Sequence, residues 1–277
     1  MSTTQTLVLG AIAGFTIFLG LPLGRYGGAT PRMRAALTAF ATGILLFLLW
    51  DVLAHGVEPV ESAVEGHDWT RVLQLAPLLG GGLAVGLMSL VYYDRWMSGK
   101  RSSPLVGPGA AAVDEFTSRS WIERLTPGRR LALLIATGIG LHNFGEGLAI
   151  GQSAAAGELS LALVLIIGFG LHNATEGFGI VGPMTGEAER PSWAFLGLMG
   201  LIGGGPTFLG TVLGQAWSSE AMSVVFFAVA AGSILYVVQE LMAVNRSYGR
   251  TVLVTWLVVA GILLGFATDF IVSAAGV

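Results

Sequence analysis

The strongest constraint on this chain is a series of long apolar segments that leave almost no room for charge. Eight such segments cover residues 6–24, 35–57, 72–95, 130–156, 159–184, 192–216, 221–243 and 251–275. A helix of about 20 residues crosses the hydrocarbon core of a bilayer. Within lipid, only a helix satisfies the backbone polar groups of a single segment by itself. The sequence therefore predicts an all-α polytopic membrane protein of eight transmembrane helices, with residues 1–277 forming one transmembrane domain.

Composition agrees with a membrane location and excludes several other classes. Hydrophobic residues make up 53% of the chain and charged residues 11%, against roughly 25% charged residues in an ordinary soluble domain. A disordered chain and a basic nucleic-acid-binding protein are excluded on these grounds. The absence of cysteine excludes thiolate metal sites, catalytic thiols and a disulfide scaffold. We expect the lipid bilayer to be a partner and nucleic acid not to be one.

The distribution of basic residues predicts the orientation of the chain in a cell membrane. With the N-terminus outside, only Arg71 among the 14 basic residues faces the exterior, as the positive-inside rule favours. An even number of spans then places the C-terminus outside as well. Residues 1–6 (MSTTQT) lack the positive region of a cleaved signal peptide. Residues 97–128, rich in Ser, Pro and Gly, are expected to form a flexible cytosolic loop, and the acidic residues 58–68 an external loop.

Two internal repeats predict how the helices are related to one another. Residues 138–147 (GIGLHNFGEG) match residues 168–177 (GFGLHNATEG) at seven of ten positions. More weakly, residues 39–43 (AFATG) resemble residues 228–232 (AVAAG), and an acid follows eight residues after each glycine. The second pair lies on helices two and seven, which run in opposite directions. We therefore expect inverted repeats, helices 1–3 and 6–8, around a central pair of helices 4 and 5, as in secondary transporters.

The first repeat places the same three polar residues near the middle of helices four and five: His142, Asn143 and Glu146 in one, and His172, Asn173 and Glu176 in the other. A His and a Glu four residues apart lie on the same helical face, with the Asn at its flank. A very short turn joins the two helices, so they pack as antiparallel neighbours. The two polar faces are expected to meet at one depth, and the neighbouring glycines to let the helices approach closely.

Charge accounting indicates what the polar faces do. Five acids lie within apolar segments whose interiors contain no Lys or Arg, because Arg95 and Arg130 stand only at segment ends: Asp51, Glu146, Glu176, Glu240 and Asp269. Ionisable residues inside a bilayer are expensive and usually paired, so either these carboxyls are protonated or a bound cation balances them. Two His and two Glu suit a tetrahedral divalent metal such as zinc. The Asn oxygens would allow higher coordination, or a second metal bridged by a Glu, which would admit iron or manganese.

The paired motif carries a family resemblance. Residues 142–149 (HNFGEGLA) and 172–177 (HNATEG) resemble the helix-four and helix-five signatures of the ZIP (Zrt/Irt-like) metal transporters, close to their bacterial branch. The resemblance covers nearly the whole chain, including the eight spans and the loop after helix three. It implies divalent-metal uptake into the cytosol, elevator-like alternating access and frequent homodimers. It also implies that a primary metal binds His142, Glu146, His172 and Glu176, and that Asn143 and Asn173 join the two Glu around a second metal.

Two departures from the family pattern bear on the structure. The proline that usually precedes each motif Glu is replaced by Gly145 and Thr175, and without a kinking proline we expect straighter helices. Residues 97–128 contain no His, whereas many relatives have a His-rich loop there. We therefore do not expect this loop to sense metal.

The remaining polar residues inside the spans suggest a route for the metal. Asp51 and His55 lie one turn apart near the outer end of helix two, and Asp269 lies in the outer half of helix eight. We expect these three to form the entrance and Glu240, near the inner end of helix seven, the exit.

The resulting functional prediction is a secondary transporter, not an enzyme, that carries zinc or else iron, manganese or cadmium into the cytosol. No cofactor is expected beyond the transported ion. The alternative is an intramembrane hydrolase with a metal-bound water. Zincin hydrolases have a His-Glu-x-x-His motif, however, and this chain has His-x-x-x-Glu twice. A carrier of organic anions is disfavoured because no basic side chain lies within a span to hold them.

Overall fold

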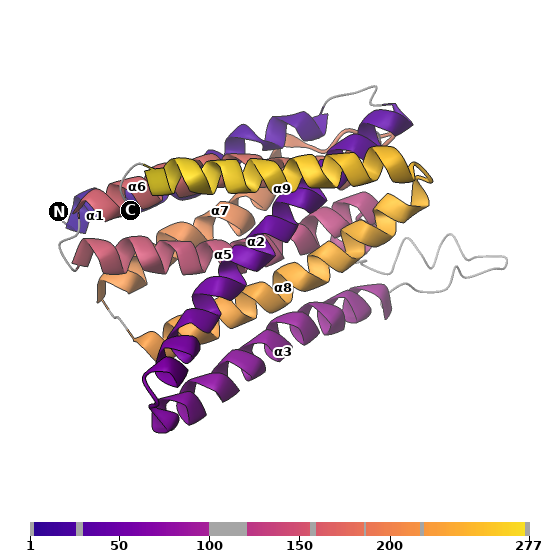
Figure 1. Cartoon of the computed structure of the whole chain (residues 1–277). Helices are drawn as coiled ribbons and strands as arrows, with labels where there is room; N and C mark the ends of the chain where they lie inside the picture. The colour runs from indigo at the N-terminus through magenta and orange to yellow at the C-terminus, as the bar shows by residue number, and fades with distance from the viewer. Residues whose placement is uncertain are drawn as a thin grey trace.

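The computed structural model describes residues 3–25, 30–99, 121–155, 159–185, 187–216 and 219–274, and within these ranges it leaves out the side chains of residues 97–99, 123–124, 159–165, 168, 171–172 and 271–273. Apart from short turns and connections, the described chain is helical, and it contains no strand (Figure 1). The long helices are α1 (Thr3–Phe15), α2 (Pro31–Glu65), α3 (Trp69–Gly99), α5 (Pro127–Ala155), α6 (Leu159–Val181), α7 (Trp193–Ala216), α8 (Glu220–Ser247) and α9 (Thr251–Ala274). The predicted all-α class is confirmed.

Most of these helices are long and apolar enough to cross a membrane. Seven segments qualify: Thr3–Arg25, Pro31–Glu65, Trp69–Trp96, Pro127–Ala155, Trp193–Ala216, Glu220–Ser247 and Thr251–Phe270. The first combines α1 with two 3₁₀ turns, η1 (Thr16–Leu19) and η2 (Leu21–Arg25). The eighth long helix, α6, packs against α1 and α5. The beginning of α1 and the end of α9 lie at the same end of the bundle (Figure 1). Which side of the membrane that end faces stays a prediction.

The structure corrects the predicted external loop. Residues 58–65 form the last two turns of α2, which continues as a helix through Pro59 and is capped by Gly66. Its first turn is fixed by Thr30, whose Oγ1 accepts a hydrogen bond from Met33 N–H at 3.2 Å. At about 1.5 Å per residue, a helix of 35 residues is much longer than the roughly 30 Å hydrocarbon core. The apolar segment 35–57 therefore predicts only the part of α2 that would lie in lipid, and the helix itself continues further.

The predicted cytosolic loop is also shorter than expected. Helix α3 continues to Gly99, a 3₁₀ turn η3 occupies Trp121–Arg124, and α5 begins at Pro127. The rest of the predicted loop, residues 100–120, lies outside the described residues. The start of α5 is fixed by Thr126, whose Oγ1 accepts from Arg129 N–H at 3.3 Å. Proline in the first helical turn is favoured because its missing N–H is not needed there.

The helices pack as two groups of four. Helices α1, α5, α6 and α7 make their most extensive contacts with one another, as do α2, α3, α8 and α9. The two groups meet mainly where α5 packs on α8 and where α2 packs on α6. In Figure 1, α3 and α8 run side by side along the lower edge of the bundle. The α5–α6 pair that carries the repeated motif is therefore built into one group together with α1 and α7.

The packing follows the exchange of helices that inverted repeats predict. Inverted repeats relate α1 to α7, α2 to α8, α3 to α9 and α5 to α6. The contact between α3 and α8 should then have a counterpart between α9 and α2, and the contact between α5 and α8 a counterpart between α6 and α2. Both counterparts are present. The glycines of the weaker repeat occupy equivalent positions. A Cβ on Gly43 would meet the backbone carbonyl of Val258 in α9, and a Cβ on Gly232 would meet that of Leu83 in α3.

A third repeat, which the sequence analysis missed, relates α1 to α7. Residues 10–24 and 200–214 are identical at eight of 15 positions, including four glycines in each copy. Gly14 and Gly204 face each other, so that a Cβ on either would meet the backbone carbonyl of the other. Small residues at such contacts allow helices in a membrane to pack backbone against backbone. The repeated glycines thus set the distance between α1 and α7.

Gly204 provides a direct test of this contact. We expect Gly204→Ala to lower the thermal denaturation midpoint in detergent, because its Cβ would collide with the Gly14 backbone. Overpacking of this kind typically costs about 1–3 kcal/mol. The neighbouring Gly205 has open space around its Cβ position, so Gly205→Ala is expected to be neutral or slightly stabilising. Equal midpoints for the two variants would contradict the proposed role of the Gly14–Gly204 contact.

Candidate metal centre

The repeated motif lies on α5 and α6, and both helices continue without interruption through Gly145 and Thr175. This continuity agrees with the absence of proline at those positions. The motif side chains that the structure describes are almost completely buried. His142, Asn143, Glu146, Asn173 and Glu176 are each at most 4% exposed.

Three predicted ligands from the two helices lie next to one another. His142 Nε2 is 3.1 Å from Glu146 Oε1, one turn further along α5, and 3.9 Å from Glu176 Oε1 on α6. The side chain of Asn143 joins them, because its Nδ2 donates to Glu176 Oε2 at 3.0 Å. The predicted meeting of the two polar faces at one depth is therefore present for these four residues.

The two asparagines are held by equivalent contacts with the neighbouring helices. Asn143 Nδ2 also donates to the carbonyl oxygen of Gly203 in α7 at 2.9 Å. Asn173 Nδ2 donates to the carbonyl oxygen of Ala13 in α1 at 3.0 Å. Positions 13 and 203 correspond to each other in the third repeat. The sequence analysis did not foresee these carbonyl partners, because main-chain acceptors leave no residue signature.

These hydrogen bonds fix which way each amide points. Because the NH₂ groups of Asn143 and Asn173 face oxygen acceptors, the amide oxygens point elsewhere. Both Oδ1 atoms are buried, and no donor from the described residues reaches either of them. Buried acceptors are nearly always satisfied in proteins. Two carbonyl-type oxygens beside a His and two carboxylates are donor atoms that suit a divalent cation.

Part of the predicted ligand set remains untested. The side chain of His172 lies outside the described residues, so its approach to the other ligands stays a prediction. Within the described residues, no group of three or more His, Asp or Glu side chains is arranged around one metal position. The described candidate ligands are therefore adjacent in pairs.

The surroundings of the two glutamates contain histidine and further acids. Residues 131–181, which carry both motifs, contain no Lys or Arg. Glu146 is within electrostatic range of Asp51 and His55 on α2, and Glu176 of His142 and Glu146. Helix α2 therefore brings the predicted entrance residues beside the central cluster.

The three predicted entrance residues differ in their exposure to solvent. The side chain of His55 is 56% exposed, and its Nδ1 lies 3.6 Å from Asp51 Oδ1. Asp51 is 23% exposed and is within electrostatic range of both His142 and Asp269. The structure thus places Asp51 near both other predicted entrance residues, His55 on the same helix and Asp269 on α9.

The predicted exit residue has partners that sequence reasoning missed. Glu240 is within electrostatic range of Asp94, at the end of α3, and both are close to Tyr236, one turn before Glu240. Asp94 is an acid inside a predicted apolar segment, and this was its only signal. Its position beside Glu240 depends on the packing of α3 on α8, which no local pattern in the sequence predicts.

The motif glycines allow close helix approach, but with different partners from those predicted. A Cβ on Gly147 would meet the backbone of Thr207 in α7, and a Cβ on Gly140 that of Ile202 in the same helix. On α6, a Cβ on Gly177 would meet the backbone of Ile17 in η1. These glycines therefore allow α5 to pack closely on α7, and α6 to pack closely on η1, which follows α1. The contact between α5 and α6 at the cluster is made by the polar side chains instead.

Comparison with known proteins agrees with this arrangement. Residues 115–273 match the family described as ZIP Zinc transporter. The zinc transporter ZupT of Shigella dysenteriae serotype 1 (strain Sd197) is 32% identical over 259 residues, which cover 88% of this chain and 90% of the relative. ZupT of Escherichia coli (strain K12 / DH10B) matches with the same identity and coverage. The repeated motif, the eight long helices and these matches together place the chain in the ZIP zinc transporter family.

Proposed function

We propose that this protein carries zinc across the cell membrane into the cytosol through the buried His/Asn/Glu cluster of α5 and α6. Its membership of a family of transporters supports divalent-metal transport and not an enzymatic activity, so the hydrolase alternative is set aside. The observation that carries the proposed site is the meeting of His142, Glu146 and Glu176 in a part of the chain without basic side chains. Iron, manganese and cadmium are further candidate cargoes.

The cluster offers the donor atoms that a divalent cation needs. His142 supplies an imidazole nitrogen, and Glu146 and Glu176 supply carboxylate oxygens, which together suit zinc. His172, from the equivalent position of the repeat, would be the fourth ligand. The buried Oδ1 atoms of Asn143 and Asn173 are available to a second ion that shares the glutamates. A cation at this depth would offset the negative charge of both carboxylates.

The proposed route follows the acids on either side of the cluster. With both termini outside, the ion arrives past His55, Asp51 and Asp269 and exchanges its water for the central ligands. It leaves towards Glu240 and Asp94 at the inner end of α8 and α3. Since metal ligands must be deprotonated to bind, protons compete with the ion at each of these positions.

The division into two helix groups suggests how access alternates. The central ligands belong to α5 and α6, in the first group, whereas Asp51 and His55 belong to α2, in the second. The site therefore lies at the boundary between the groups. Movement of the first group along the second would expose the ligands first to one side of the membrane and then to the other, as in other transporters built from repeats.

The glutamate of the second motif is the sharpest test of the site. We expect Glu176→Ala to reduce zinc uptake at least about tenfold, because even the partners of metal ligands are worth that much in affinity. Asn173→Ala should have a smaller effect, since it removes a neutral oxygen and leaves the charge balance unchanged. Uptake of radioactive zinc is measured in cells that lack other zinc importers, at matched expression. Gln152→Ala, on the same helix as the first motif, serves as the control. Parent-level uptake by Glu176→Ala would refute the assignment.

A disulfide between the groups tests their relative movement, and the native chain has no cysteine to interfere. A Cβ on Gly179 in α6 would lie 3.8 Å from Cβ of Ala41 in α2, a typical spacing for a disulfide. Oxidation of Ala41→Cys/Gly179→Cys should stop zinc uptake, and reduction should restore it, because the bond ties the two groups together.

The control pair lies within the second group. A Cβ on Gly56 in α2 would be 3.3 Å from Cβ of Phe227 in α8. Oxidised Gly56→Cys/Phe227→Cys should transport at the same rate as its reduced form. If the oxidised Ala41→Cys/Gly179→Cys protein also transports at its reduced rate, the two groups do not move against each other at this contact.

A further inference from the structure

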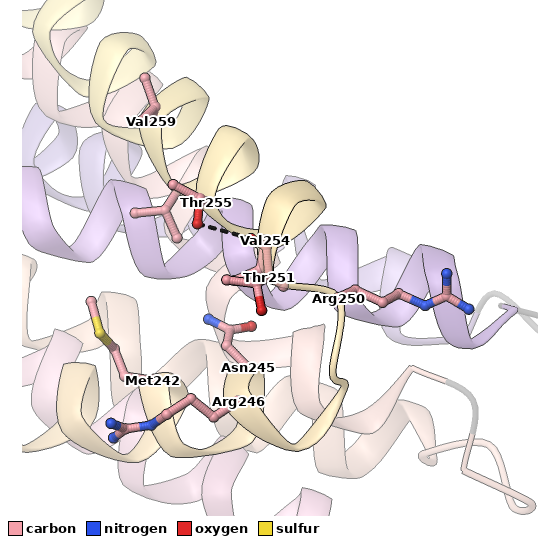
Figure 2. A pocket seen from close by; sticks show the side chains of 9 residues that line it. Met242, Asn245, Arg246, Arg250, Thr251, Val254, Thr255 and Val259 are labelled. Atoms are coloured by element: carbon pink, nitrogen blue, oxygen red, sulfur yellow. Dashed lines mark hydrogen bonds between the residues drawn. The ribbon is translucent and has the colours of Figure 1, made fainter.

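A groove of about 380 Å³ lies where α8 ends and α9 begins (Figure 2). A short turn containing Gly249, with a positive φ of 62°, joins the two helices. Among the described residues, however, α8 and α9 pack extensively on α2 and not on each other. The two helices therefore diverge from the turn and leave a wedge between them on the outer surface of the second group. In a bilayer, such a wedge is open to lipid.

The walls of the groove are apolar along most of their length. Met242 on α8 and Val254, Val258 and Val259 on α9 line it. Met242 is 37% and Val259 38% exposed, so these side chains have apolar surface to offer to a ligand. An acyl chain lying along them would fill the space between the two diverging helices.

The end of the groove next to the turn is cationic. Arg246 on α8 and Arg250 before α9 both line it and are exposed. Neither guanidinium has an acidic partner among the described residues. In Figure 2 they point away from each other, on opposite sides of Asn245. The groove thus presents two separate positive positions. Arginine pairs well with phosphate because its planar fork of donors matches the phosphate oxygens.

Between the two arginines lies a buried acceptor without a donor. Asn245 is 5% exposed, and its Nδ2 donates to Thr42 Oγ1 at 2.9 Å. The hydroxyl of Thr42 donates its one hydrogen to Thr38 O at 2.7 Å, so it can only accept from Asn245. This fixes the amide orientation and directs Oδ1 away from Thr42. No donor from the described residues reaches that oxygen, and buried acceptors rarely stay unsatisfied.

We propose that this α8–α9 groove binds cardiolipin, a lipid with two phosphodiesters joined by a glycerol that carries one free hydroxyl. Its two phosphates match the separate positions of Arg246 and Arg250, and its hydroxyl is the donor that Asn245 Oδ1 needs. Acyl chains lie along Met242, Val254 and Val258. Basic pockets between membrane helices are suited to such head groups. The site is distinct from the metal centre and does not depend on the transport function.

Lipid binding is measured by native mass spectrometry of the detergent-purified full chain, titrated with defined lipids. We expect cardiolipin to bind about fivefold more tightly than phosphatidylglycerol, which offers one phosphate, because one arginine contact near a membrane surface is worth about 1 kcal/mol. Phosphatidylcholine, with no net charge and no head-group donor, should bind most weakly. Equal binding of the three lipids would overturn the proposal.

Variants locate the site. Arg246→Gln and Arg250→Gln should each weaken cardiolipin binding about fivefold. Arg95→Gln, at an exposed arginine near the end of α3, should leave it unchanged. An equal loss for Arg95→Gln would mean that general surface charge, not this groove, holds the lipid. The three substituted arginines are all exposed. Each variant is accepted only with a parent-like gel-filtration profile and denaturation midpoint.

Two further titrations test the assigned contacts. A synthetic cardiolipin without the central hydroxyl should bind several-fold more weakly to the parent, because Asn245 Oδ1 then has no donor; unchanged binding would remove Asn245 from the site. A large excess of inorganic phosphate should not displace cardiolipin, and displacement would show that the groove recognises phosphate alone. A lipid-free dimer that is lost in Arg246→Gln would identify a second copy of the chain as the occupant and overturn the proposal.

Discussion

The structure depends on burying two glutamates inside a helix bundle, in a stretch of sequence, residues 131–181, that contains no Lys or Arg. Glu146 and Glu176 lie where α5 meets α6, and their neighbours include His142 and Asn143. Burying an ionised carboxylate is costly unless it is paired. In the proposed function, a bound cation would offset the negative charge of both carboxylates. This requirement connects the fold to the transport of metal ions more directly than any single contact does.

The helices around the cluster hold the ligands in place through main-chain contacts. Each motif asparagine is anchored to a backbone carbonyl, Asn143 to Gly203 and Asn173 to Ala13. Two glycines also let the helix backbones approach closely: Gly147 of α5 packs against α7, and Gly177 of α6 packs against η1. The two halves of the site are thus built by the same device, applied twice to repeated sequences. A backbone anchor keeps an amide oriented without adding a competing charge.

Much of this arrangement can be predicted from the sequence, because a bilayer restricts the possible structures so strongly. The helical class, the spans and the motif on α5 and α6 follow from apolar length and from a repeat with unusual residues. The C-terminal end of α2 does not follow in this way. Apolar length predicts only the part of a helix that lies in lipid, whereas Glu58 and Glu65 are good helix formers in water. The Asp94–Glu240 pair and the glycine partners depend on which helices are neighbours. Contacts between residues far apart in the sequence decide which helices become neighbours. Only the repeat that relates α1 to α7 indicates such a contact, and the sequence analysis missed it.

The unexpected length of α2 has a consequence for the proposed route of the ion. Asp51, Glu58 and Glu65 are seven residues apart, so they lie along one stripe of a helix that is unbroken through Pro59. At about 1.5 Å per residue, the stripe extends roughly 21 Å. These carboxylates are thus carried by one continuous helix instead of a flexible loop. Along the proposed route, a cation attracted to Glu65 or Glu58 would therefore be held beside the same helix that carries Asp51.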